Sequence, residues 1–309
     1  MDGLTVFLKS LKSDEEMQEL HEPCSPTSRS LARQHAQWRA EFGPDLAGAW
    51  ESCEAGDDNA SLLVQELIRS GHSPAELKGC LDRATSSGNE PLVAKLLALG
   101  IPYDIHVART AVDNGLVDTL SLFVAQGWDI NEEQSWCQAP LLGHAIIIHA
   151  SDSVISWFLE HGADPNAACT AGITPFSNAV KVAPLRTIQQ CLDHCHEDTV
   201  FKGYPLHTAS QRNDDISVEV VELVLRRCRC NVNSIEWDDN AFTYACWKVM
   251  GLGTPLHEVA KGGHPGVAEL LLREGVDMTI KDSLGKTAIE VAEAMGNVEV
   301  MRVLRDAEN

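Results

Sequence analysis

Two segments near the carboxyl end of the chain repeat one pattern at a fixed distance. The first begins GTPLHEVAKGGHPGVAELLLREGVDMTIKD at Gly253, and the second begins GKTAIEVAEAMGNVEVMRVLRD at Gly285. The interval from Thr254 to Thr287 is 33 residues. This repeat constrains the fold more than any other feature, because a unit of that size cannot bury its apolar face alone and has to stack on its neighbours.

The first copy predicts two short helices joined by a turn. Thr254 is suited to cap a helix, and Pro255 is suited to its first turn. Gly263 turns the chain, and Gly275 supplies the positive φ that ends the second helix. The apolar residues form one stripe on each helix: Leu256, Val259 and Ala260 on the first, then Val267, Leu270 and Leu271 on the second.

This block resembles the ankyrin repeat, whose hallmark stands here as Thr254, Pro255, Leu256 and His257. The resemblance implies an all-α fold, an ankyrin-repeat solenoid of stacked helical hairpins with extended fingers. It also implies that His257, and His207 in the related block Tyr-Pro-Leu-His, are structural residues bonded to neighbouring backbone. A solenoid of this family is expected to hold another macromolecule on its concave side.

Weaker copies follow from the same anchors. The turn glycine and the terminating glycine stay 12 residues apart in the pairs Gly88 and Gly100, Gly115 and Gly127, and Gly263 and Gly275. Cys195 and Arg229 replace the terminating glycine in two other copies. The repeats are predicted to begin near Gly79, His106, Ala139, Thr174, Tyr204, Thr254 and Thr287. We therefore expect seven repeats over residues 79–309, a degenerate capping repeat over 44–78, and a tail over 1–43 with one helix near Ser30 to Phe42.

The charge balance is strongly acidic. Lys and Arg number 24 against 45 Asp and Glu, which gives a formal net charge of −21. Such a chain repels phosphates and anionic membrane surfaces, so we expect neither a nucleic acid nor a membrane as partner, but a neutral or basic protein. The start of the chain mixes basic and acidic residues where a signal peptide needs an apolar core, which favours the cytoplasm, with the nucleus as a second compartment.

Catalytic and metal-binding patterns were weighed against this interpretation. The sequence holds no Gly-x-Ser-x-Gly elbow, phosphate-binding loop or dinucleotide fingerprint, so no catalytic residue and no cofactor is assigned. One metal hypothesis stays open, because two neighbouring helices carry Cys191, His194, Cys195 and Cys228, which could form a tetrahedral zinc site. The spacing matches no established zinc signature, and cysteine is also a common small buried residue.

One finger is longer than the others. The connection from Asn233 to Thr254 takes 21 residues, whereas the interval from Asn166 to Thr174 takes eight, so about 13 residues are inserted near 234–253. Aromatic anchors ringed by polar groups favour binding. The sequence therefore predicts a partner-binding site that comprises Glu236, Trp237, Asp238, Asp239, Phe242, Tyr244 and Trp247, with Trp136 of an earlier finger on the same side.

Two interpretations of the function follow. The first is a non-catalytic protein-binding or scaffold protein that uses the concave surface. The alternative is an atypical enzyme or small-molecule binder with a pocket between the 234–253 insertion and the concave helices. A structural alternative also exists for the insertion itself, which could fold back and bury its aromatic residues against the neighbouring repeat.

Overall fold

A computed structural model describes residues 43–308 of the chain. The predicted helix near Ser30 to Phe42 and almost all of the tail lie outside these residues. The described part is helical, as predicted, and its only bridge of the β type outside helices joins Ser135 and Gln138. Within the described residues, none of the helices is both long enough and apolar enough to span a bilayer.

The helices follow one another as antiparallel hairpins, with one short helical insertion. The hairpins are α4 (Pro44–Ala55) with α5 (Ala60–Arg69), α6 (Lys78–Ser86) with α7 (Glu90–Ala98), α8 (Ile105–Asp113) with α9 (Val117–Ala125), α10 (Leu141–Ile147) with α11 (Asp152–Glu160), α12 (Pro175–Val182) with α13 (Leu185–Asp193), α14 (Pro205–Ser210) with α15 (Ser217–Cys228), α17 (Pro255–Gly262) with α18 (Pro265–Arg273), and α19 (Ala288–Met295) with α20 (Val298–Glu308). The insertion holds α16 (Ala241–Trp247) and the 3₁₀ helix η2 (Lys248–Met250).

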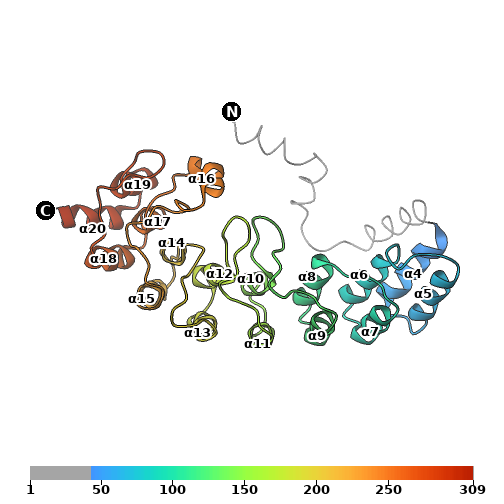
Figure 1. Cartoon of the computed structure of the whole chain (residues 1–309). Coiled ribbons are helices and arrows are strands. Elements are labelled where there is room, and N and C mark those ends of the chain that lie inside the picture. Colours follow the sequence, from blue (N-terminus) through green and yellow to red (C-terminus); the bar gives the residue numbers. More distant parts are fainter. Residues whose placement is uncertain (1–42, 309) are drawn as a thin grey trace.

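The hairpins stack side by side into a curved array (Figure 1). The second helices, such as α11, α13 and α15, lie along its outer side, while the first helices and the fingers lie along the inner side. The α16 helix sits on this inner side, beyond α17. The assignment of residues 44–78 to a capping repeat and of residues 79–309 to seven repeats stays a prediction.

The Thr-Pro pattern starts helices through reciprocal hydrogen bonds. The backbone N–H of Thr254 donates to Nδ1 of His257 at 3.0 Å, and the N–H of Thr174 donates to the hydroxyl of Ser177 at 3.0 Å. Since Nδ1 of His257 accepts, its Nε2 carries the proton and donates to the carbonyl of Lys286 at 3.1 Å. One side chain thus caps α17 and also holds the strand-like finger that leads to the next hairpin.

The burial pattern agrees with the predicted stripes. Leu256, Val259 and Ala260 of α17 and Val267 and Leu271 of α18 are fully buried in one continuous core that runs along the array. Each stripe is covered by the neighbouring hairpin, because a two-helix unit has too little surface to cover itself.

The positions that end the second helices carry left-handed backbone, as the spacing predicted for glycine. Gly100, Gly127 and Gly275 have φ between 79° and 93°. Arg229 ends α15 with φ 46°, so a residue with a Cβ occupies the conformation that glycine adopts elsewhere. Cys195 does not take this conformation, and α13 ends at His194 with φ −92°.

The strain at Arg229 leads to a test. We expect Arg229→Gly to raise the free energy of unfolding by about 0.5 to 1 kcal/mol, because the left-handed conformation costs a non-glycine residue roughly 1 kcal/mol or more. Urea denaturation followed by circular dichroism measures it. Arg229→Ala is the control, since it removes the charge and keeps the Cβ. An equal gain in both variants would show that the charge, and not the backbone, is unfavourable.

Candidate functional site

The 234–253 insertion forms a closed loop on the inner side of the array. Its base is fixed by the backbone N–H of Glu236, which donates to the carbonyl of Gly253 at 3.0 Å. Its helix α16 begins at Asn240, whose side chain accepts from the N–H of Thr243 at 3.0 Å. The insertion therefore has its own local start signal and a defined shape.

The insertion folds back onto a finger that lies about 70 residues earlier in the chain. The hydroxyl of Thr243 donates to the carbonyl of Ala171 at 3.1 Å, in a buried position. The ring of Trp237 lies against Gly172, where an added Cβ would come within 2.9 Å of the indole. Gly172 has φ 87°, so both its backbone and its lack of a side chain suit this contact.

The insertion is also tied to the finger that follows it. The N–H of Ser283 donates to the carbonyl of Leu252 at 2.8 Å, and the N–H of Leu252 donates to the hydroxyl of Ser283 at 2.7 Å. The insertion thus joins fingers on both sides of α17. Regular repeats contact only their neighbours, so this loop stiffens the inner face over a longer distance.

The predicted site residues divide into two groups. Phe242 is 54% exposed and Trp136 is 41% exposed, and their rings meet edge to face at 5.8 Å between centroids. Asp238 and Asp239 are exposed, and Tyr244 and Trp247 are half-buried. Of these six residues, the structure brings Trp136 and Phe242 into contact, while Asp238 and Asp239 line one cleft and Trp247 lines another.

Glu236 and Trp237 differ from the prediction, because both are buried. Trp237 is 5% exposed, and its ring packs against Tyr204 at 5.1 Å and Trp247 at 5.5 Å between centroids. The sequence predicted Trp237 as an exposed anchor. The structure instead supports the alternative of a folded-back insertion for this residue, because Gly172 leaves a recess that the indole fills.

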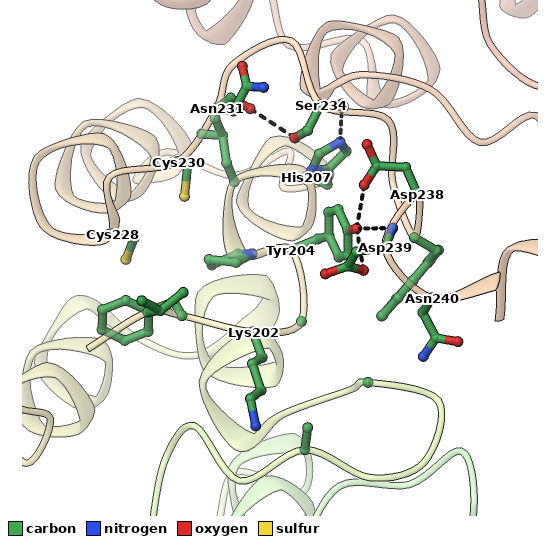
Figure 2. A pocket seen from close by; sticks show the side chains of 18 of the residues that line it. Lys202, Tyr204, His207, Cys228, Cys230, Asn231, Ser234, Asp238, Asp239 and Asn240 are labelled. Atoms are coloured by element: carbon green, nitrogen blue, oxygen red, sulfur yellow. Dashed lines mark hydrogen bonds between the residues drawn. The ribbon is translucent and has the colours of Figure 1, made fainter. Parts of the chain in front are cut away.

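A first cleft lies between the insertion and the finger before α14 (Figure 2). It has a volume of about 700 Å³. The Tyr204 hydroxyl lies 2.7 Å from a carboxylate oxygen of Asp238 and 2.6 Å from one of Asp239 (Figure 2). Burial and these two carboxylates raise the pKa of Tyr204, so the hydroxyl keeps its proton and donates it. This contact holds both aspartates at the lip of the cleft.

Strained backbone is concentrated around this cleft. Three of its lining residues have positive φ without being glycine: Tyr204 at 50°, Arg229 at 46° and Trp237 at 63°. Such conformations persist only where the surroundings enforce them, and they are common at functional sites. His207 lines the same cleft and donates from Nε2 to the carbonyl of Ser234 at 2.9 Å, which agrees with its predicted structural role (Figure 2).

A second cleft lies on the other side of Trp237, between the insertion and helices α12, α14 and α17. It has a volume of about 630 Å³. Glu236 and Glu258 line it together with Lys181 and Lys261. The sequence interpretation placed a pocket at this location but did not predict Glu258, Lys181 or Lys261 in it. The signal that could have found Glu258 is its position directly after the Thr-Pro-Leu-His block, on the first helix of its hairpin.

The zinc hypothesis gains no support from the geometry. No group of three or more His, Cys, Asp or Glu residues within 43–308 is placed to hold a metal ion. Cys191 is buried, which raises the pKa of its thiol to about 12, and Nδ1 of the exposed His194 lies 2.9 Å from the carbonyl of Gln190. The thiol of Cys191 is therefore a packed core group.

Comparison with known families is consistent with the repeated hairpins. The family model described as the ankyrin repeat matches residues 253–283, the block that carries the Thr-Pro-Leu-His hallmark. Residues 253–283 therefore form an ankyrin repeat. The fingers and first helices of the array form the inner side, on which the insertion lies (Figure 1), and both clefts are lined by residues of the insertion.

Two solved structures illustrate how far the likeness extends. The ankyrin repeat domain of Bcl-3, described as a unique member of the IkappaB protein family, is 24% identical with a TM-score of 0.49, and the match covers 76% of this chain and 99% of that chain. The ankyrin repeat protein EF0377 is 20% identical with a TM-score of 0.45, and the match covers 66% of this chain and 98% of that chain. No curated protein matches the sequence. The likeness does not bear on what this chain binds.

The buried position of Trp237 leads to a stability test. We expect Trp237→Ala to lower the free energy of unfolding by about 3 kcal/mol or more, because it leaves a cavity against Gly172 and Tyr204. Phe242→Ala, on the exposed side of the same insertion, is the control and should change it by less than about 0.5 kcal/mol. Urea denaturation of both variants measures the difference. Equal, small effects would mean that the insertion does not stabilise the array.

The buried histidine His207 predicts a dependence of stability on pH. Burial lowers its pKa to about 4, below the 6.5 of the unfolded chain. The unfolded state therefore takes up a proton first, so the stabilisation is present above pH 6.5 and is lost as the pH falls towards 4. Between pH 7 and 5 the loss from this one group is about 2 kcal/mol.

Urea denaturation at pH 7 and pH 5 checks this expectation. His207→Gln is the matched variant, since it keeps a donor for the Ser234 carbonyl and does not titrate. It should lose less stability on acidification than the wild type. The same loss in both proteins would assign the acid sensitivity to other groups.

Proposed function

We propose that this ankyrin-repeat protein is a non-catalytic protein-binding or scaffold protein whose binding site lies on the inner face, around the insertion. Ankyrin repeats mediate protein–protein interactions, and the repeat at residues 253–283 supports this coarser role for the chain. The finer proposal is supported by one observation, the exposed pair formed by Trp136 and Phe242.

This pair has the features of a binding anchor. The two aromatic rings come from different fingers, yet the backbone that carries them is fixed, because the N–H of Ala171 donates to the carbonyl of Trp136 at 2.7 Å and Thr243 bonds to the carbonyl of Ala171. Anchors that are already ordered lose little entropy on binding. Exposed large aromatic residues on a rigid scaffold favour a protein partner.

The charge of this region favours a neutral or basic partner. Asp238 and Asp239, on the same insertion as Phe242, are exposed and are held in place by Tyr204. The net charge of −21 acts in the same direction over the whole surface and disfavours nucleic acids and anionic membranes. We place this interaction in the cytoplasm, with the nucleus as a second compartment, as an extension of the proposal.

The alternative function, a small-molecule binder or an atypical enzyme, has one observation in its favour. The second cleft lies where that interpretation expects a pocket, and it contains the buried carboxyl group of Glu236. We favour protein binding because the exposed aromatic residues lie outside the clefts, where a small ligand would not cover them.

Removal of the aromatic pair tests the proposal. A partner recovered with the wild-type protein should bind the double variant Trp136→Ala and Phe242→Ala more weakly by about 2 kcal/mol or more. Since both rings are exposed, the melting temperature should change little. Isothermal titration calorimetry and thermal denaturation measure the two quantities.

The matched control is Leu62→Ala on α5, which removes an apolar side chain that is 58% exposed at a distant position of the array. It should leave the affinity unchanged. Retained binding in the double variant, together with a loss in Leu62→Ala, would place the site away from the insertion and contradict the proposal.

A further inference from the structure

The second cleft combines aromatic walls with charged groups. Trp237 and Trp247 line it, with their rings 5.5 Å apart between centroids and nearly perpendicular, at 79°. Val249 and Met250 form its lip and are 54% and 68% exposed. A volume of about 630 Å³ is within the range of ligand pockets.

Most of the charge in the cleft is already paired. Lys261 contacts a carboxylate oxygen of Glu258 at 2.7 Å and donates to the carbonyl of Gly251 at 2.7 Å. The other carboxylate oxygen of Glu258 accepts from Nε2 of Gln211 at 3.0 Å. Glu258 and Lys261 therefore neutralise each other and are held in one arrangement.

Glu236 and Lys181 are the exceptions, and Glu236 is the buried one. Its side chain is 9% exposed and lines the cleft, yet its carboxyl group makes no hydrogen bond or ion pair with any of the described residues. Burial, and then the neighbouring Glu258, raise its pKa to about 7, although Lys261 and Lys181 act in the opposite direction. The carboxylate oxygens of Glu236 still reach solvent in the cleft, so an incoming donor can bond to them.

We propose that this cleft takes the side chain of a lysine or arginine from a bound protein segment. Glu236 pairs with the charged head group, and the indoles of Trp237 and Trp247 cover the alkyl stem and attract the cation through their π-systems. This inference rests on the proposed protein-binding function and identifies the chemistry of the partner. Val249 and Met250 are exposed at the lip of the cleft, where a protein segment can cover them and a free amine cannot. The net charge of −21 favours a basic segment.

Lys181 gives the proposal a discriminating variant. It is exposed at the edge of the cleft, on α12, and forms no ion pair with the described residues. A basic ligand is repelled by Lys181, whereas an anionic ligand would be attracted by it. Lys181→Gln should therefore strengthen the binding of a basic side chain, and Glu236→Gln should weaken it.

The experiment uses four capped tripeptides, acetyl-Gly-X-Gly-amide with X as lysine, arginine, glutamine or glutamate, and the full-length protein. Binding is followed by the NMR signals of the indole N–H groups of Trp237 and Trp247. We expect the lysine and arginine peptides to bind about tenfold more tightly than the glutamine peptide, and Glu236→Gln to remove that difference. Thermal denaturation verifies that both variants fold.

The dependence on pH supplies a second readout. Since the pKa of Glu236 is about 7, its carboxyl group gains its charge as the pH rises through neutrality. The affinity for the lysine peptide should rise about tenfold from pH 6 to pH 8 in the wild type and stay flat in Glu236→Gln.

Three results would overturn the inference. Equal binding of the lysine peptide by the wild type and Glu236→Gln excludes the proposed pairing. Tighter binding of the glutamate peptide, weakened by Lys181→Gln, assigns an anionic ligand. If spermidine binds far more tightly than either basic peptide, the ligand of the cleft is a free amine and not a protein side chain.

These outcomes are separate from a failure of the protein-binding function. If the affinity for the peptides does not depend on Glu236 but the affinity for the recovered partner still depends on Trp136 and Phe242, only this inference fails. If basic peptides bind at Glu236 but the affinity for a recovered partner does not depend on Trp136 and Phe242, the protein-binding site proposed above is wrong instead.

Discussion

The stacking of hairpins is the interaction on which the rest of this structure depends. Each pair of helices exposes an apolar stripe that only the next pair can cover, so stability is gained by extending the array and not by closing a single core. The stripe of Leu256 and Val259 is fully buried for this reason, although it belongs to a helix of eight residues. The histidine of the Thr-Pro-Leu-His block adds a polar link, since His257 caps its own helix and bonds to the carbonyl of Lys286.

The insertion is an exception to nearest-neighbour contact. It contacts a finger about 70 residues earlier and another about 30 residues later, through Thr243 and Ser283. Trp237 is central to this arrangement, because its ring fills the recess at Gly172 and separates the two clefts. The same residue therefore stabilises the insertion and shapes both cavities, which explains why an aromatic residue in a long finger need not be a surface anchor.

The two clefts differ in how their polar groups are satisfied. In the first, the Tyr204 hydroxyl bonds to Asp238 and Asp239 at the lip, and His207 bonds to a backbone carbonyl. These contacts hold Tyr204 in its strained backbone conformation. In the second, one ion pair is complete and Glu236 is left without a partner. The carboxyl group of Glu236 faces the open second cleft and has no partner among the described residues, which makes this cleft the better candidate for recognition.

The sequence alone determined the repeating part of this protein. The interval from Thr254 to Thr287, the spaced glycines and the Thr-Pro starts predicted the helices and their ends, because these signals act within a few residues along the chain. The exposed members of the candidate site, Trp136 and Phe242, were also named from the sequence, although their contact was not.

Only the tertiary structure decided which insertion residues are buried. Residues 234–253 have no periodic pattern of apolar residues. The sequence therefore does not predict which side chains of the insertion are buried or which segment they contact. Trp237 is buried because Gly172 approaches it from a distant finger, and Lys261, which lines the same cleft as Glu236, is paired with Glu258 instead. Both outcomes depend on contacts between segments far apart in the chain, which local propensity and spacing cannot specify.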